Sequence, residues 1–414
     1  MNSTVNIQAA KYHSVRQDFP LLQQHMHAKP IAYLDNAATT QQPNIVIETT
    51  MQYMRTSHAN VHRGMYELSM HATDAFESVR IKVQKFINAP YAHECIFVSG
   101  ATEGINLVAF SYAMSKLQAG DEILITAMEH HANILPWQQV CARTGAVLKV
   151  VPVAANGEII FAELQCLLSK RTKIVAVAHA SNSLGTINPI RQIVDCAHQV
   201  GAVVLVDGAQ ACPHLDIDVV ALGCDFYTFS AHKMYGPTGV GVLWGREDLL
   251  NAMPPYQCGG EMISYVTFTT AEYAPLPAKF EAGTPNIIGV IGFGAALDYL
   301  NTIDLPGLHT YEQELLTYAT ARLASLQNFT IIGTAQSKVP ILSFVHKYIH
   351  AHDLSTILDQ FGIAIRSGHH CAMPLMQSLQ LVATARMSLA FYNTIAEIDR
   401  MLEALQYAES VFKL

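Results

Sequence analysis

Residues 203–233 read VVLVDGAQACPHLDIDVVALGCDFYTFSAHK, and this stretch decides the predicted fold. Two short runs rich in β-branched and aromatic residues, Val203 to Asp207 and Phe226 to Ser230, predict two neighbouring strands. Polar residues follow each run at once, in VDGAQ and in FSAHK. Because ligands of open α/β sheets bind beyond the carboxyl ends of the strands, we expect a site where these two strands end.

The same alternation of strand-like runs and helical periods extends from about residue 95 to 246. This pattern predicts an α/β fold with a mostly parallel, seven-stranded sheet and crossover helices, in which some pairings at the end of the sheet can be antiparallel. The other five predicted strands are Cys95 to Ser99, Glu122 to Thr126, Val147 to Val151, Lys173 to Ala178 and Gly241 to Trp244.

The character of the chain changes after Gly294 to a helix-rich tail with strand candidates at Ile341 to Val345 and Ile363 to Arg366 and a final amphipathic helix, Ile395 to Phe412. A chain of 414 residues also exceeds the size at which one core keeps growing. We therefore predict a large α/β domain over residues 28–294 and a smaller α+β domain over residues 295–414. Residues 1–27 are short and polar, so we expect an N-terminal arm that packs on the smaller domain.

Composition and charge exclude several classes of partner. The net charge is −8 and no run of lysines or arginines exists, so nucleic acid is not an expected partner. The longest apolar stretch, Ile287 to Leu297, is too short to span a bilayer, so we expect no membrane partner and a cytoplasmic location. A weak organelle-targeting segment in the first residues stays open. Eight cysteines without a CxxC pair indicate a reducing compartment and no metal site.

Lys233 and Asp207 fit two needs of pyridoxal phosphate (PLP) chemistry, a lysine amine that forms a Schiff base and an acid that keeps the pyridinium nitrogen protonated. Singly, a lysine is usually a surface charge and an aspartate usually a turn residue. For the cofactor phosphate, SGATEG at 99–104 follows a predicted strand and opens a helix, where backbone N–H groups and Thr102 can bind an anion. Similar turns also serve packing alone.

Other polar residues follow further predicted strands. MEHHAN at 128–133 offers His130 or His131 as an imidazole that stacks on the cofactor ring and transfers protons near neutral pH. Asn182 in SNSLGT and Arg386 in TARMSLA can hold a substrate carboxylate, the arginine by its bidentate fork. For the histidines the competing interpretation is a structural role, since the chain has 19 histidines. For Arg386 it is an ordinary ion pair.

RSGHHCAMP at 366–374 places Cys371 after two histidines and near Arg366, in a short loop after a predicted strand. Nearby positive charge favours the thiolate, the reactive form of cysteine. A buried, inert cysteine is the more frequent case, but a glycine and two histidines make a poor apolar environment. We therefore expect Cys371 to be reactive.

Nine motifs together resemble those of the SufS-type, or class II, cysteine desulfurases, in the order of that family and from about residue 15 to the C-terminus. They are LDNAATT at 34–40, VHRG at 61–64, ATEGINLVA at 101–109, MEHHAN, VDGAQ, FSAHK, YGPTGVG at 235–241, FEAGTPN at 280–286 and RSGHHCAMPL. The resemblance implies a PLP-dependent transferase of fold type I that acts as a homodimer. Such an enzyme converts L-cysteine to L-alanine, stores the sulfur as a cysteine persulfide and supplies it for iron–sulfur cluster assembly.

The resemblance also implies a role for each matching residue. Lys233 would form the Schiff base and His130 would stack on the ring as the acid/base, and both would be catalytic together with the sulfur acceptor Cys371. The other cofactor ligands would be Asp207 at the pyridinium, Gln210 at the ring oxygen, and Thr102, Ser230, His232 and, from the other subunit, Thr284 at the phosphate. Asn182 and Arg386 would hold the substrate carboxylate, and Arg366 would line the cysteine loop. A partner of the SufE or SufU kind would receive the sulfur.

Three alternatives remain at the level of sequence. A selenocysteine lyase would use the same thiol and ring, so the sequence does not separate it from a desulfurase. An aminotransferase of the same fold would need Lys233 and Asp207 but not Cys371. A non-catalytic scaffold is disfavoured because a candidate residue is present for every role.

Overall fold

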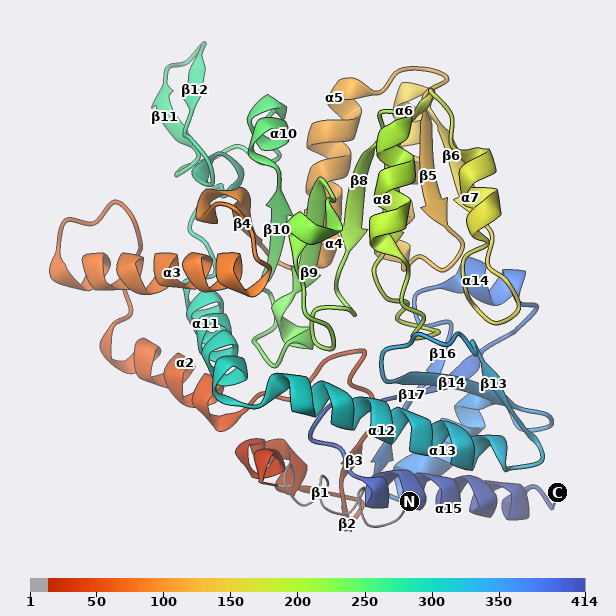
Figure 1. The fold of residues 1–414 in the computed structure, drawn as a ribbon. Coiled ribbons are helices and arrows are strands. Elements are labelled where there is room, and N and C mark those ends of the chain that lie inside the picture. The colour runs from red at the N-terminus through yellow and green to blue at the C-terminus, as the bar shows by residue number, and fades with distance from the viewer. Residues whose placement is uncertain (1–13, 414) are drawn as a thin grey trace.

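A seven-stranded sheet forms the larger part of the structure, a computed structural model that describes residues 14–413 (Figure 1). Its strands, in spatial order, are β4 (Cys95–Val98), β10 (Gly241–Gly245), β9 (Phe226–Ser230), β8 (Val203–Asp207), β7 (Thr172–Ala178), β5 (Glu122–Thr126) and β6 (Val147–Val151). Only β10 runs against its neighbours. The predicted mostly parallel sheet, the bounds of its strands to within one residue and the antiparallel pairing at one end are all confirmed.

Successive side chains of each strand point to opposite faces, so the apolar runs of the central strands bury both faces of the sheet. On one face, Ile123 and Leu205 belong to a core cluster with Trp137 of helix α6. On the other face, Leu124 and Val204 belong to the larger core. The helices on the first side are α4 (Ala101–Leu107) and α6 (Leu135–Thr144), and those on the second are α3 (Glu67–Phe86), α8 (Ile190–Gln199) and α11 (Ile287–Thr302).

A smaller, antiparallel sheet lies beyond the carboxyl ends of the parallel strands, which point toward it in Figure 1. Its strands, in order, are β13 (Phe329–Ile332), β14 (Ile341–His346), β17 (Thr384–Ser388) and β16 (Arg366–Gly368). Three helices of this part are α12 (Leu305–Ala324), α13 (Ala351–Gln360) and α15 (Ile395–Val411), and the predicted final helix is confirmed by α15. The two sheets therefore enclose the place where the sequence predicts a site.

The single strand predicted over Ile363 to Arg366 is wrong, because the segment divides between two sheets. Ile363 and Ala364 form β15, which pairs in parallel with β3 (Ala32–Tyr33). Arg366 begins β16, which pairs with β17 instead. The change of partner at Ile365 turns the chain so that Arg366 reaches the neighbourhood of Arg386, its register partner.

The division into domains at residues 28, 294 and 295 stays a prediction. Helix α11 runs without a break across the last boundary, from Ile287 to Thr302. Of the predicted arm, residues 1–13 lie outside the described residues.

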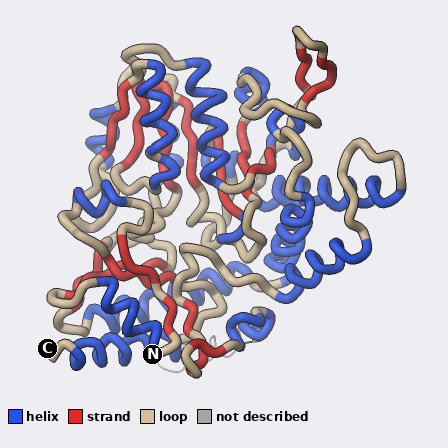
Figure 2. Tube along the Cα trace, turned by 180° about the vertical axis from the view of Figure 1, so that it is seen from behind, coloured by secondary structure: helices blue, strands red, loops and turns tan. Residues whose placement is uncertain are grey.

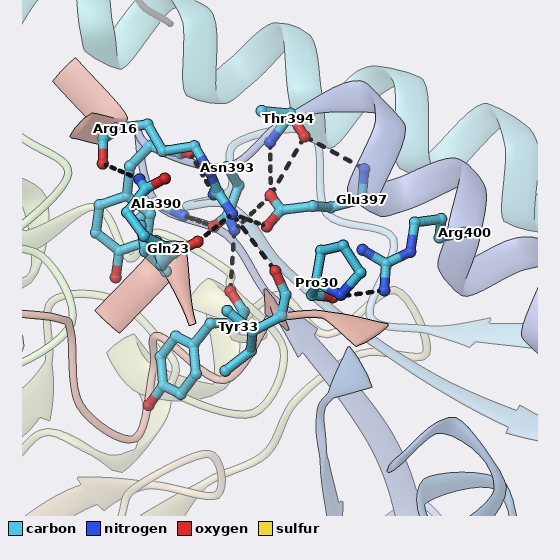
Figure 3. Close-up of polar contacts among 12 residues, drawn as sticks. Arg16, Gln23, Pro30, Tyr33, Ala390, Asn393, Thr394, Glu397 and Arg400 are labelled. Carbon is cyan, nitrogen blue, oxygen red and sulfur yellow. Dashed lines mark hydrogen bonds and ion pairs between the residues drawn. The ribbon is translucent and has the colours of Figure 1, made fainter. Parts of the chain in front are cut away.

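Arg16, near the start of the described residues, contacts the beginning of α15, as Figure 3 shows. Arg16 donates to the carbonyl of Tyr392 (3.0 Å) and forms an ion pair with Glu397 of α15 (2.9 Å). Glu397 also accepts from the backbone N–H of Thr394, whose hydroxyl caps the helix in return, a reciprocal capping box. The fully buried Phe19 packs on the ring of Tyr392, with the centroids 4.6 Å apart. This segment is thus tied to the C-terminal helix.

Among the described residues, no single helix has the length and hydropathy of a membrane span. One bent pair, α11 followed by α12 at 86°, meets the criterion only when both helices are taken together.

Candidate active site

A cavity of about 210 Å³ lies at the carboxyl ends of β7, β8 and β9. Its wall includes every predicted site residue other than Thr284, namely Thr102, His130, Asn182, Asp207, Gln210, Ser230, His232, Lys233, Arg366, Cys371 and Arg386. Residues far apart in the sequence therefore meet at one place, as the rule for open α/β sheets predicts. Thr284 lies outside this cavity, in an exposed loop that precedes α11.

Alanines make up much of the remaining wall, at positions 37, 38, 101, 132, 178, 180 and 209. Their methyl groups extend little from the backbone, so the cavity keeps room for a flat ring between polar side chains. This shape, together with a lysine and an aspartate in the same wall, fits PLP.

Lys233 and Asp207 are a buried amine and a buried carboxylate that face the same space. Burial lowers the pKa of Lys233, and the nearby Asp207 opposes that shift. Burial likewise raises the pKa of Asp207, against the effect of Lys233. The amide of Ala209 donates to Asp207 (3.0 Å) and fixes its orientation at the end of β8. A lysine with a lowered pKa is more often neutral, and a neutral amine is the form that attacks a carbonyl.

The N-terminus of α4 forms another wall of the cavity. The backbone N–H of Ala101 donates to the Ser230 hydroxyl (2.9 Å), and Thr102 and His232 lie in the same wall. Burial lowers the pKa of His232 to about 4, so this imidazole is neutral at pH 7 and one nitrogen can donate to an anion. Hydroxyls, an imidazole and free backbone N–H groups at a helix start fit a phosphate.

This wall depends on a close approach between two backbones, because a Cβ built on Gly241 would lie 2.5 Å from the Cα of Gly100. Only glycine at position 241 lets β10 pass so near the residue that precedes α4.

The two histidines of MEHHAN differ in position, and His130 is the one that the resemblance assigns to the cofactor ring. His130 lines the cavity, whereas His131 does not. The Nδ1 of His130 accepts from the amide of Ala132 (3.0 Å), which leaves the ring proton on Nε2. Burial, aided by Lys233, lowers the pKa of His130 to about 4. The ring is therefore neutral near pH 7 and held in one orientation, as a stacking acid/base would need.

Arg386 and Arg366 share one carboxylate, that of Asp35. Arg386 donates to Asp35 (2.8 Å) and to the carbonyl of Asn182 (2.9 Å), and Arg366 lies 3.3 Å from the second oxygen of Asp35. The Nε of Arg386 is buried and has no hydrogen-bond partner among the described residues 14–413. An unpaired donor on a buried cation is an attractive place for a substrate carboxylate.

Asp35 is a residue that the sequence interpretation missed, although LDNAATT was singled out as a motif. Its two arginine partners come more than 300 positions later, so only the fold reveals the pairing.

Cys371 lies in the loop between β16 and α14 (Met373–Ser378) and is exposed with a free thiol. His370 and Cys371 both have left-handed backbone conformations, with φ of 52° and 55°. Such conformations are costly for residues other than glycine and persist where neighbours hold them. One stabilising contact is a hydrogen bond from the side-chain amide of Asn182 to the carbonyl of His370 (2.6 Å).

Comparison with known proteins shows the family of this chain. The family model for aminotransferase class-V matches residues 32–401. A cysteine desulfurase of Enterobacter sp. strain 638 is 51% identical over 393 residues, which are 95% of this chain and 97% of the relative. A cysteine desulfurase of Escherichia coli strain K12 / DH10B is 48% identical, with the same coverage. The crystal structure of the Escherichia coli cysteine desulfurase CsdA matches with a TM-score of 0.90 and 39% identity, over 97% of this chain and 98% of that one.

Proposed function

The chain belongs to the aminotransferase class-V family and is a PLP-dependent cysteine desulfurase, and we propose that Cys371 takes the sulfur from L-cysteine while L-alanine is released. One observation carries the assignment of Cys371: a free, exposed thiol lines the same cavity as a half-buried lysine and a buried aspartate. An aminotransferase has no need of that thiol.

When bound, PLP withdraws electrons from the α-carbon of the amino acid attached to it. Lys233 would hold the cofactor before substrate arrives and then, as a neutral amine, carry the α-proton. Asp207 would keep the ring nitrogen protonated, and Gln210 and His130 would fix the ring from the side and the face. Thr102, Ser230 and His232 would bind the phosphate.

Substrate orientation would come from the unpaired Nε of Arg386, with Asn182 close by on the same wall. Arg366 is linked to Arg386 because both pair with Asp35. The carboxylate of L-cysteine would therefore meet two positive charges, one of them deeply buried. This end of the cavity would point the sulfur of the substrate toward the loop of Cys371.

The sulfur step is balanced without an external oxidant. The thiolate of Cys371 attacks the substrate sulfur, an S–S bond forms, and the C–S bond of L-cysteine breaks. The β-carbon of the substrate takes up a proton and becomes the methyl group of L-alanine, and the enzyme keeps the sulfur as a persulfide on Cys371. That persulfide leaves by exchange with a second thiol.

The direct test is a single exposure of the purified, PLP-loaded protein to L-cysteine. We expect alanine in amounts that match the protein, and one added sulfur of about 32 Da on the peptide that carries Cys371. A parallel exposure to L-selenocysteine measures the lyase alternative. Sulfur on a different cysteine, or a keto acid in place of alanine, would contradict the proposal.

We also propose a homodimer in which Thr284 completes the phosphate site of the partner subunit. Two observations support it. Thr284 is exposed and lies outside the cavity of its own chain. In addition, the hairpin of β11 (Ile263–Val266) and β12 (Ala271–Tyr273) projects from the body (Figure 2). Its apolar side chains at Tyr265, Val266 and Phe268 are exposed. Exposed apolar groups on a projecting element favour burial against a partner.

Hybrid dimers test the shared site. Lys233→Ala and Thr284→Ala proteins are each expected to be inactive or nearly so, and mixing them after dissociation should restore activity to the one intact site of each hybrid dimer. The measurement is alanine release by mixtures in which mass spectrometry demonstrates hybrids. Two inactive parents whose demonstrated hybrids stay inactive would exclude the contribution of Thr284.

The receiving partner belongs to the proposal as well. A short, held loop limits how far the persulfide can travel, so an acceptor protein of the SufE or SufU kind would bring its own thiol to Cys371, and the sulfur would serve iron–sulfur cluster assembly. All eight cysteines of the chain are free, and we propose the cytoplasm, a reducing compartment, as its location.

A further inference from the structure

His131 contacts the cysteine loop, although it does not line the cavity. Its backbone N–H donates to the carbonyl of Cys371 (2.7 Å), and its ring Nε2 accepts from the backbone N–H of Met373 (3.0 Å). His131 thus binds the residues on both sides of Ala372, one through its backbone and one through its side chain, although Ala372 lies more than 200 positions from His131 in the sequence.

We propose that His131 is a positioning residue that holds the Cys371 loop in the conformation from which the thiol attacks. The inference rests on the proposed role of Cys371 and assigns the second histidine of MEHHAN, which the cofactor does not use.

The helix after the loop explains why an outside residue is needed. Met373 is the first residue of α14, so its N–H has no partner within the helix. The preceding Ala372 has only a methyl group and makes no side-chain cap. The ring of His131 supplies the missing acceptor from η5 (His131–Asn133) and caps α14 from a different part of the chain.

The backbone of the loop gives the second reason. His370 and Cys371 are consecutive left-handed residues, a pair that relaxes unless contacts on both sides hold it. Asn182 and Thr384 bind His370 on the upstream side, through its carbonyl and through its ring (2.8 Å). On the downstream side, His131 binds Cys371 and Met373. Loss of the hydrogen bonds from His131 would free the Cys371 thiol to move.

The ring must be neutral to accept the bond. Burial and the neighbouring His369 both lower the pKa of His131, so its Nε2 keeps its lone pair near pH 7. His131 also directly follows His130, so the residue that holds the loop is fixed to the residue that faces the cofactor.

Two variants separate the ring acceptor from ring volume. His131→Phe keeps a planar ring but cannot accept from Met373, whereas the side-chain oxygen of His131→Gln can. We expect persulfide formation on Cys371 in a single turnover to be up to about tenfold slower in His131→Phe, the upper end of the scale of one lost hydrogen bond. His131→Gln should recover most of that rate. PLP absorbance and the KM for L-cysteine should stay unchanged in both.

A second readout does not depend on turnover. In the parent protein the amide of Met373 should be protected from hydrogen–deuterium exchange, and His131→Phe should lose that protection in the peptide spanning 369–376 while iodoacetamide labels Cys371 at an altered rate. His350→Phe is the matched control, because the ring of His350 also accepts from a backbone N–H, that of His352 (3.2 Å), at the start of α13. It should leave the loop peptide and the persulfide rate unchanged.

An unprotected Met373 amide in the parent protein would overturn the proposal even if His131→Phe fails to fold. So would a His131→Phe protein with parental exchange and persulfide rate. If the parent places no sulfur on Cys371, the assigned function fails instead, and the exchange and labelling data still decide the contact.

Discussion

Cys371→Ala is expected to keep its bound PLP and to bind L-cysteine, yet to form no persulfide and release almost no alanine. The substitution deletes the thiol that we propose as the sulfur acceptor and leaves Lys233, Asp207 and Arg386 in the cavity wall. A group that acts only in the sulfur step removes turnover without removing binding, so we expect a loss of at least about 1,000-fold in alanine release. Alanine release is measured by chromatography, and cofactor retention by absorbance.

Cys166→Ala is the matched control for this variant. Cys166 is also free and exposed, but it lies on α7 (Phe161–Leu167), outside the cavity. It should react with alkylating agents much as an ordinary surface thiol does and should be dispensable. Undiminished alanine release from Cys371→Ala, or an equal loss in Cys166→Ala, would defeat the assignment of the sulfur acceptor.

Lys233→Ala is expected to abolish the covalent link to the cofactor and to lower alanine release by roughly 1,000-fold or more, since both cofactor attachment and proton transfer are lost. We expect free PLP still to enter, because the residues proposed to bind its phosphate remain. Borohydride, which makes a lysine–PLP link permanent, should label Lys233 alone when the parent protein is mapped by peptides.

Lys338 is an internal control for the labelling experiment. Burial lowers its pKa to about 8, so it is a second lysine with an unusually available amine, but it lies outside the cavity. If a lowered pKa alone decided labelling, Lys338 would carry PLP as well. Label on Lys338 rather than Lys233 would contradict the site, and Lys338→Ala should leave the cofactor in place.

The sequence predicted the large sheet well because its strands are short runs rich in apolar residues, and the strands other than the edge strand β6 are buried on both faces. Polar residues directly after β8 and β9 were predictable for the same reason, since the end of a buried strand is where a side chain can first meet a ligand. The residue pattern alone left His130 and His131 open, because adjacent residues of the same type give no periodic signal, and only the family resemblance pointed to His130.

Contacts between distant segments explain the rest. The ion pairs of Asp35 are apparent only in the fold, where β17 and β16 bring Arg386 and Arg366 to its carboxylate. The break in the predicted strand at Ile365 reflects a choice between two sheet partners, β3, which lies more than 300 positions earlier, and β17, which lies about 20 positions later. Local patterns specify elements and their ends, whereas these pairings depend on how the elements assemble.

The approach of Gly241 to Gly100 restricts which sequences can build this cavity. Any side chain at position 241 would begin with an atom 2.5 Å from a backbone carbon and 2.7 Å from the carbonyl oxygen of Phe229, neither of which can rotate away. Position 241 touches no predicted reactant, yet among random substitutions it should be nearly as intolerant as a catalytic position. A screen that scores only lost activity would therefore list it beside Lys233, and a measurement of folded yield is what would tell the two kinds of position apart.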